Sequence, residues 1–147
     1  MTSDSAAESA GVPGDRFVGY KASETIQVTD KMVRQFAEMS GDFNPIHMDE
    51  EYAKSTRFHR RIAHGMILGA LVSRFLNEKI GSGGIYLAQT LKFSNPVYID
   101  DIITFDLEIT RLHKTRGLGI VETIAKKSTG ETVLKGEATI MMSWGLK

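Results

Sequence analysis

The stretch "GMILGALVSRFLNEKI", residues 65–80, contains the longest strongly apolar run of the sequence and constrains how the rest of the chain can fold. It is apolar on nearly all sides as far as Arg74, whereas a surface helix carries only an apolar stripe. We therefore predict a helix that is buried in the protein. Gly69 lies inside it, at a cost of about 1 kcal/mol relative to alanine, which indicates close contact with a sheet.

After a glycine-rich break at residues 81–84 the pattern changes from helical to alternating, which is typical of strands with one buried face. Four sets share this pattern: Leu87, Gln89, Leu91 and Phe93; Ile103, Phe105, Leu107 and Ile109; Leu118, Ile120 and Ile124; and Leu134, Ala138, Ile140 and Met142. Turn-like segments separate them and predict an antiparallel meander. A long apolar helix followed by such strands favours an α+β fold, in which the antiparallel sheet wraps around the central helix.

The part of the chain before the buried helix is less regular. Residues 16–29 are predicted to form an edge strand, and residues 30–40 a helix. Thr29 is of the type that caps a helix N-terminus, and Gly41 of the type that ends a helix. A short helix is expected at residues 49–56.

Length and composition exclude several classes of protein. At 147 residues the chain suits one domain, which we place at residues 15–147 after a small, polar tail (1–14) that is predicted to be disordered and lacks the features of a signal peptide. The 18 basic residues balance the 18 acidic ones, so nucleic acid is an unexpected partner. No segment is long enough to span a membrane, and the absence of cysteine fits a reducing compartment. We therefore expect a cytoplasmic protein.

The segment "SGDFNPIHMDEEYA", residues 40–53, places a carboxylate and an imidazole close together just before the buried helix. Pro45 stiffens the segment between Asp42 and His47. An acid and a base at neutral pH are the groups that general acid–base catalysis requires. The alternative is a purely structural role, in which Asp42 or Asn44 only forms a local turn.

His64 and Gly65 come at the start of the buried helix, where backbone amides lack internal acceptors and carry the positive end of the helix dipole. Glycine lets a ligand approach the backbone closely. A carbonyl oxygen directed at the amide of Gly65 would be polarised, and an enolate forming there would be stabilised. Together with Asp42 and His47 these are the parts needed to add water across a conjugated double bond, or to remove it.

A metal site and a simple solvated surface are alternative interpretations of the polar residues. Three histidines and two aspartates of this region match no standard zinc spacing, so we expect no metal. His64 could simply have its hydrogen bonds satisfied at the helix N-terminus, without a catalytic role. The basic segment "KSTRFHRR", residues 54–61, is most often a solvated face, and it could also meet phosphates or an acidic carrier protein.

The loop, followed a few residues later by "RIAHGM" at 61–66, resembles the MaoC-like (R)-specific enoyl-CoA hydratase family, whose members have the hot dog fold. The similarity runs from about Phe17 to Met142 and includes "IYLAQTLKFSNPVYIDD" at 85–101. The resemblance implies that Asp42 and His47 are the acid–base pair and that Gly65 binds the thioester oxygen. It also implies a homodimer or larger assembly.

Within the fold that this resemblance implies, dehydratases of the bacterial fatty-acid elongation type and many thioesterases place a catalytic carboxylate within the central helix. Between Met66 and Lys79 the acidic residue here is Glu78, about 20 Å from Gly65 at 1.5 Å per residue. That separation disfavours a mechanism in which a carboxylate of the central helix acts on the substrate.

We therefore predict a lyase of fatty acid metabolism that reversibly hydrates trans-2-enoyl thioesters to (R)-3-hydroxyacyl thioesters, without a metal or redox cofactor. Coenzyme A or acyl carrier protein enters only as part of the substrate. The alternatives are a 3-hydroxyacyl-ACP dehydratase, a non-catalytic acyl-thioester binding or assembly subunit, and a thioesterase. The residues expected to bind substrate or position the loop are Asn44, His64, Leu71, Phe75 and Leu76, and those expected to meet the phosphates of the carrier are Arg57, Arg60 and Arg61.

Overall fold

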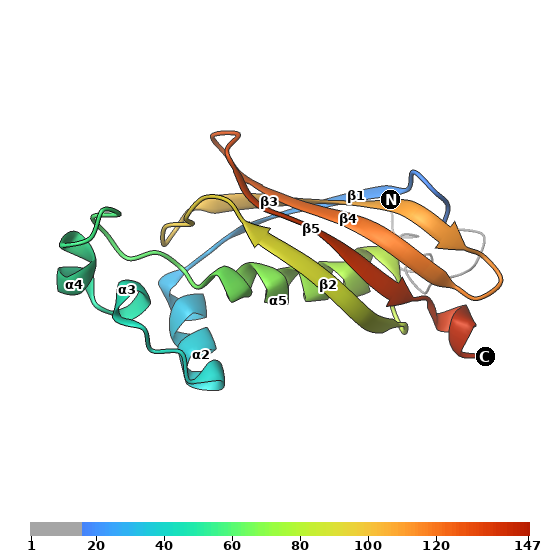
Figure 1. Ribbon diagram of the computed structural model, residues 1–147, viewed down its shortest axis with the longest axis horizontal. Helices are drawn as coiled ribbons and strands as arrows, with labels where there is room; N and C mark the ends of the chain where they lie inside the picture. Colours follow the sequence, from blue (N-terminus) through green and yellow to red (C-terminus); the bar gives the residue numbers. More distant parts are fainter. Residues whose placement is uncertain (1–15) are drawn as a thin grey trace, which may run out of the picture.

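A computed structural model describes residues 16–147, in which one long helix lies against a face of a five-stranded antiparallel sheet (Figure 1). The predicted tail, residues 1–14, lies outside the described residues. The strands are β1 (Lys21–Gln27), β2 (Ile85–Phe93), β3 (Ile102–His113), β4 (Leu118–Lys127) and β5 (Thr132–Met141). The helices are α2 (Asp30–Ser40), α3 (Pro45–Met48), α4 (Glu50–Lys54) and α5 (Gly65–Phe75); a π-helical turn, η2 (Leu76–Ile80), extends α5, and a 3-10 turn, η3 (Ser143–Leu146), ends the chain. The predicted α+β arrangement is confirmed.

The strand order, β1-β3-β4-β5-β2, differs from the predicted meander. Strands β3, β4 and β5 are consecutive neighbours, but β2 pairs with β5 at the far edge of the sheet. Because β1 already occupies the free edge of β3, β2 bonds to the free edge of β5. The expectation that residues 16–29 contain an edge strand is confirmed by β1, which pairs only with β3 within the described sheet.

The core forms between α5 and the inner face of the sheet. The inward set predicted for β3 is confirmed, since all four of its apolar residues are buried, as are those predicted for β5. For β4 the prediction is wrong: Gly119, Val121, Thr123 and Ala125 face inward, and the larger Leu118, Ile120 and Ile124 lie on the other face. Small side chains on this central strand leave room for the helix that packs against it.

Glycines of α5 face β2, as the sequence indicates for Gly69. A Cβ atom at Gly69 would lie 3.2 Å from the Leu91 side chain, and one at Gly65 would lie 3.1 Å from the ring of Phe93. Glycine thus lets helix and sheet approach closely here, and a Cβ at either position would be accommodated only by a shift of a few tenths of an ångström in the Leu91 or Phe93 side chain.

The helices before α5 gather at the end of the sheet where α5 begins (Figure 1). Thr29 caps α2 by accepting a hydrogen bond from the Met32 amide, and Gly41 ends the helix with a left-handed φ of 81°. The short helix expected at 49–56 is α4, with Asp49 as its N-cap. Helix α3, which the sequence analysis did not predict, begins at Pro45. None of the helices in residues 16–147 is long and apolar enough to cross a bilayer.

Candidate active site

The imidazole of His47 is held by the backbone of the segment that leads into α5. Its Nδ1 lies 2.8 Å from the carbonyl oxygen of Ile62. A carbonyl only accepts, so Nδ1 carries the hydrogen and Nε2 is left with a lone pair. Burial lowers the pKa of His47 from its ordinary 6.5, and the neighbouring His64 lowers it further, while the bond to Ile62 and the Asp42 carboxylate oppose the shift. His47 is therefore a neutral base at neutral pH.

The ring of His64 connects the loop to the start of α5. It is 2% exposed, and its Nε2 donates to the backbone carbonyl of Asp42 at 2.9 Å. The ring centroid lies 4.0 Å from that of His47 and 4.8 Å from that of Phe36. Its Nδ1 has no hydrogen-bond partner among the described residues. The contacts of His64 thus fix both the Asp42 backbone and the plane of the His47 ring.

The carboxylate of Asp42 is the third polar side chain beside His47 and His64. It is exposed, and it accepts a hydrogen bond from the Asn44 amide at 3.2 Å. Asn44 in turn accepts from the Ile46 amide as the N-cap of α3. One side-chain ligand atom each of Asp42, His47 and His64 lie within 4.8 Å of one another, a spacing that could also hold a metal ion. The fold thus joins residues that are separated by up to 22 positions in the sequence.

Gly65 stands where α5 begins, and its preceding residue gives the helix no side-chain cap. Gly65 and His47 line the same cavity, which has a volume of about 320 Å³. Its other lining residues come mainly from the segment before α5 and from the end of β2: Arg57, Phe58, Ile62, Ala63, Leu68, Phe93, Ser94, Asn95, Pro96 and Val97. Gly65, at a helix N-terminus, and the base His47 therefore line one partly apolar space.

The predicted acyl-chain residues Leu71, Phe75 and Leu76 do not line this cavity, and their contact with an acyl chain stays a prediction. They are buried in the core, where Phe75 packs against Phe105 with ring centroids 5.3 Å apart. The reason is the register of α5, because Leu68, one turn after Gly65, takes the position facing the cavity. The aromatic lining residues Phe58 and Phe93 were missed; the position of Phe93 at the end of its strand, before "SNP", was the available signal.

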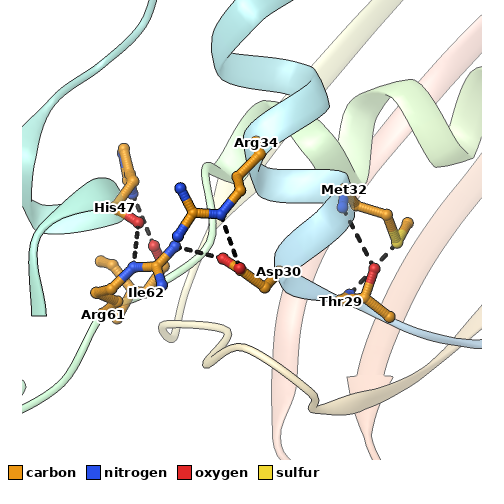
Figure 2. Close-up of polar contacts among 7 residues, drawn as sticks. All are labelled: Thr29, Asp30, Met32, Arg34, His47, Arg61 and Ile62. Carbon is orange, nitrogen blue, oxygen red and sulfur yellow. Dashed lines mark hydrogen bonds and ion pairs between the residues drawn. The ribbon is translucent and has the colours of Figure 1, made fainter.

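The three arginines expected near the carrier have different surroundings. Arg57 lines the cavity, and Arg60 stacks on the ring of Tyr98 at 3.9 Å. Arg61 instead points into the protein: its side chain is 11% exposed and contacts the carboxylate of Asp30 and the carbonyl of His47, each at 2.6 Å (Figure 2). Two of its three side-chain nitrogens, Nε and Nη2, are bonded within the chain, so the carrier proposal below does not include Arg61.

The arrangement can carry out proton transfer beside a polarised carbonyl. A carbonyl oxygen at the Gly65 amide would face the positive end of α5, and His47 offers a neutral base on the same cavity. Asp42, which does not line the cavity, offers an acceptor beside that imidazole. These groups match the requirements of addition or elimination next to a carbonyl group.

Comparison with known proteins gives consistent results. The family model described as "MaoC like domain" matches residues 18–132. An (R)-specific enoyl-CoA hydratase from Aeromonas caviae is 36% identical, covering 85% of this chain and 94% of its own length. A mitochondrial 3-hydroxyacyl-[acyl-carrier-protein] dehydratase from Arabidopsis thaliana is 34% identical, covering 85% and 76%. The structure of an unliganded R-hydratase from Pseudomonas aeruginosa superposes with a TM-score of 0.83 at 38% identity, covering 88% of this chain and 84% of that one.

Proposed function

The chain belongs to the MaoC-like domain family, and from that premise we propose that it reversibly hydrates trans-2-enoyl thioesters to (R)-3-hydroxyacyl thioesters. It is a lyase with the hot dog fold. The observation that carries the proposal is the meeting of His47 and Gly65 at one cavity, with the Asp42 carboxylate beside the imidazole.

In the proposed mechanism, Asp42 and His47 together activate water and move one proton. The water oxygen bonds to C3 of the enoyl group, and a proton is delivered to C2, so that the elements of water are added and nothing is oxidised. The amide of Gly65 stabilises the negative charge that develops on the thioester oxygen. Asp42 and His47 share these two roles, so water activation is assigned to the pair.

The test is a panel of trans-2-enoyl-CoA substrates of rising chain length, followed by loss of enoyl absorbance and by chiral analysis of the product. We expect an (R)-3-hydroxyacyl product and a preference for acyl chains that the cavity can accept. No hydration of any member, or an (S)-product, would contradict the proposal.

The same assay separates the alternatives. A thioesterase would release free thiol, which a thiol reagent detects. A non-catalytic subunit would bind the thioester while its enoyl absorbance stayed constant. Since all four motif residues are present (Asp42, Asn44, His47 and Gly65), catalysis is the favoured alternative.

The carrier is proposed to be coenzyme A, with Arg57 and Arg60 near its phosphates. Arg57 lies at the cavity, and Arg60 is held over the ring of Tyr98. The name of the Arabidopsis thaliana relative raises acyl carrier protein as the second candidate. Matched crotonyl thioesters of the two carriers decide between them: a higher kcat/KM for the coenzyme A thioester supports the proposal, and the reverse order overturns it.

The proposed assembly is a homodimer that forms along β2. This edge strand has an unpaired side within the described sheet, and it exposes Ile85, Tyr86, Leu87 and Phe93, each between 39% and 48%. An exposed apolar edge strand favours pairing with another chain. A second copy supplies such a strand by symmetry.

Analytical ultracentrifugation tests this assembly. Leu87→Lys is expected to increase the monomer fraction, because it places a charge at the proposed interface. Ile102→Lys is the control, since Ile102 is similarly exposed (40%) on another strand. A monomeric wild type, or equal behaviour of the two variants, would contradict the dimer.

No metal or redox cofactor is proposed for the reaction, because proton transfer and charge stabilisation account for it. Asp42, His47 and His64 offer three ligand atoms, the number that a catalytic zinc site also has, so removal of metal by a chelator tests this expectation. The cytoplasmic location stays a prediction.

A further inference from the structure

Residues Arg61 and Ile62 hold the segment that carries His47 by three separate contacts. The Ile62 amide donates to the Ile46 carbonyl at 3.3 Å, and the Ile62 carbonyl accepts from His47 Nδ1 at 2.8 Å. The Arg61 Nε donates to the carbonyl of His47 itself at 2.6 Å. His47 is therefore fixed at its ring and at its backbone by two adjacent residues.

The guanidinium of Arg61 also connects this segment to α2. Its second donor nitrogen lies 2.6 Å from the carboxylate of Asp30, in the first turn of that helix (Figure 2). Asp30 is itself placed by the cap at Thr29 and paired with Arg34 at 2.8 Å. The planar guanidinium can bond to two acceptors in different directions at once, whereas a lysine ammonium is a single point charge. We refer to the chain of contacts Asp30–Arg61–His47 as the Arg61 bridge.

We propose that Arg61 is a positioning residue, which holds His47 in the place and orientation required for proton transfer. The inference rests on the proposed function of His47. The bridge has the properties of a structural support: its arginine side chain is only 11% exposed, although Asp30 is 42% exposed, it is charge-assisted at its Asp30 end, and it runs from a capped helix to the backbone of α3. A displacement of about 1 Å at a reacting group can lower a rate about 10²-fold.

The sharpest comparison is between two arginines that share one partner. Arg34 and Arg61 both contact Asp30, but of the two only Arg61 contacts His47 in the described structure. We expect Arg61→Met to lower kcat at least tenfold with a much smaller change in KM, because substrate contacts are kept while the base is misplaced. Arg34→Met should stay within about twofold of the wild type, as expected for an exposed ion pair.

Two further variants separate positioning from general loss of stability. Arg61→Lys is expected to recover part of the lost kcat, since one ammonium can reach only one of the two acceptors. Asp30→Ala is expected to lower kcat less than Arg61→Met, because Arg61 can still donate to His47 without its second anchor. Thermal unfolding of each variant shows the fraction folded at assay temperature, so that kcat is compared among folded proteins.

A nitrogen NMR measurement on the His47 ring makes the test independent of turnover. In the wild type at neutral pH, we expect Nδ1 to carry the hydrogen and Nε2 to be bare. In folded Arg61→Met we expect a mixture of the two neutral forms, and in Arg34→Met the wild-type form. If the wild type hydrates no thioester but this difference is seen, the proposed function is wrong, while the positioning of His47 by Arg61 is still supported.

The proposal is overturned if folded Arg61→Met keeps both wild-type kcat and the wild-type ring form while the enzyme is active. It is also overturned if Arg34→Met lowers kcat as much as Arg61→Met does, because the effect would then follow the charge at Asp30 and not the contact with His47.

Discussion

The apolar half of the molecule, α5 with β3 to β5, and its polar corner, residues 40–64, are held together in different ways. In the apolar half, fully buried side chains such as Val72, Phe75 and Ile109 are fixed by packing. In the polar corner the chain forms only two short helices, and the reacting groups are fixed by hydrogen bonds to backbone carbonyls, including those of Ile62 and Asp42.

This difference indicates a division of roles. Packing energy depends on how much apolar surface is buried and tolerates small shifts, whereas a hydrogen bond fixes a direction. The apolar half thus supplies most of the stability, and the polar corner supplies the orientation that proton transfer requires. The following variants should affect one region and spare the other.

Phe75→Ala should have the largest effect, on stability alone. Removing this fully buried ring should lower the free energy of unfolding by about 3–5 kcal/mol. The kcat of the protein that remains folded should stay close to wild type, because Phe75 does not line the cavity. Denaturant unfolding measures the loss, and Met39→Ala, at a side chain that is 73% exposed, is the control and should change it by less than about 0.5 kcal/mol. A large fall in the kcat of folded Phe75→Ala would show that the two regions are not separable.

Asp42→Asn should show the opposite pattern. The carboxylate is exposed, so its replacement should leave the unfolding temperature nearly unchanged. Its kcat for crotonyl-CoA should fall at least about 10²-fold, the lower end for acid–base catalysis and equivalent to about 2.7 kcal/mol. Near-normal turnover by this variant would show that the Asp42 carboxylate is not required for catalysis.

The pH dependence of kcat/KM should reflect the burial of His47. Burial lowers its pKa below the ordinary 6.5, so the imidazole gains its proton at a lower pH than an exposed histidine does. We therefore expect kcat/KM, measured with a stable coenzyme A thioester, to fall on the acid side with a midpoint below pH 6.5. A midpoint above pH 6.5 would indicate that another group controls the rate.

Prolonged dialysis against a metal chelator should have no effect. The expectation follows from a mechanism that uses only Asp42, His47 and the Gly65 amide. The assay is kcat before and after dialysis, with metal content followed in parallel. A loss of activity that returns on addition of a divalent metal would show that the Asp42–His47–His64 group holds an ion.

Local patterns predicted most of the elements and indicated the candidate residues, but not their distant partners. The buried helix, the inward face of β3 and the cap at Thr29 follow from residue periodicity and residue type within a few positions. The placement of β2 depends on which sheet edge is free, and the inward face of β4 depends on the space that α5 leaves. Arg61 was assigned to the phosphates of the carrier because its partners within the chain, Asp30 and His47, lie 31 and 14 residues away.

The most direct test of the polar corner is the kcat of His47→Gln beside that of His113→Gln, on crotonyl-CoA and with folding checked by thermal unfolding. His113 ends β3 and is exposed, so its replacement removes a histidine without touching the cavity. We predict a fall of at least about 10²-fold for His47→Gln and wild-type turnover for His113→Gln. Wild-type turnover by folded His47→Gln would contradict the proposal that this imidazole, held by the Ile62 carbonyl, transfers the proton.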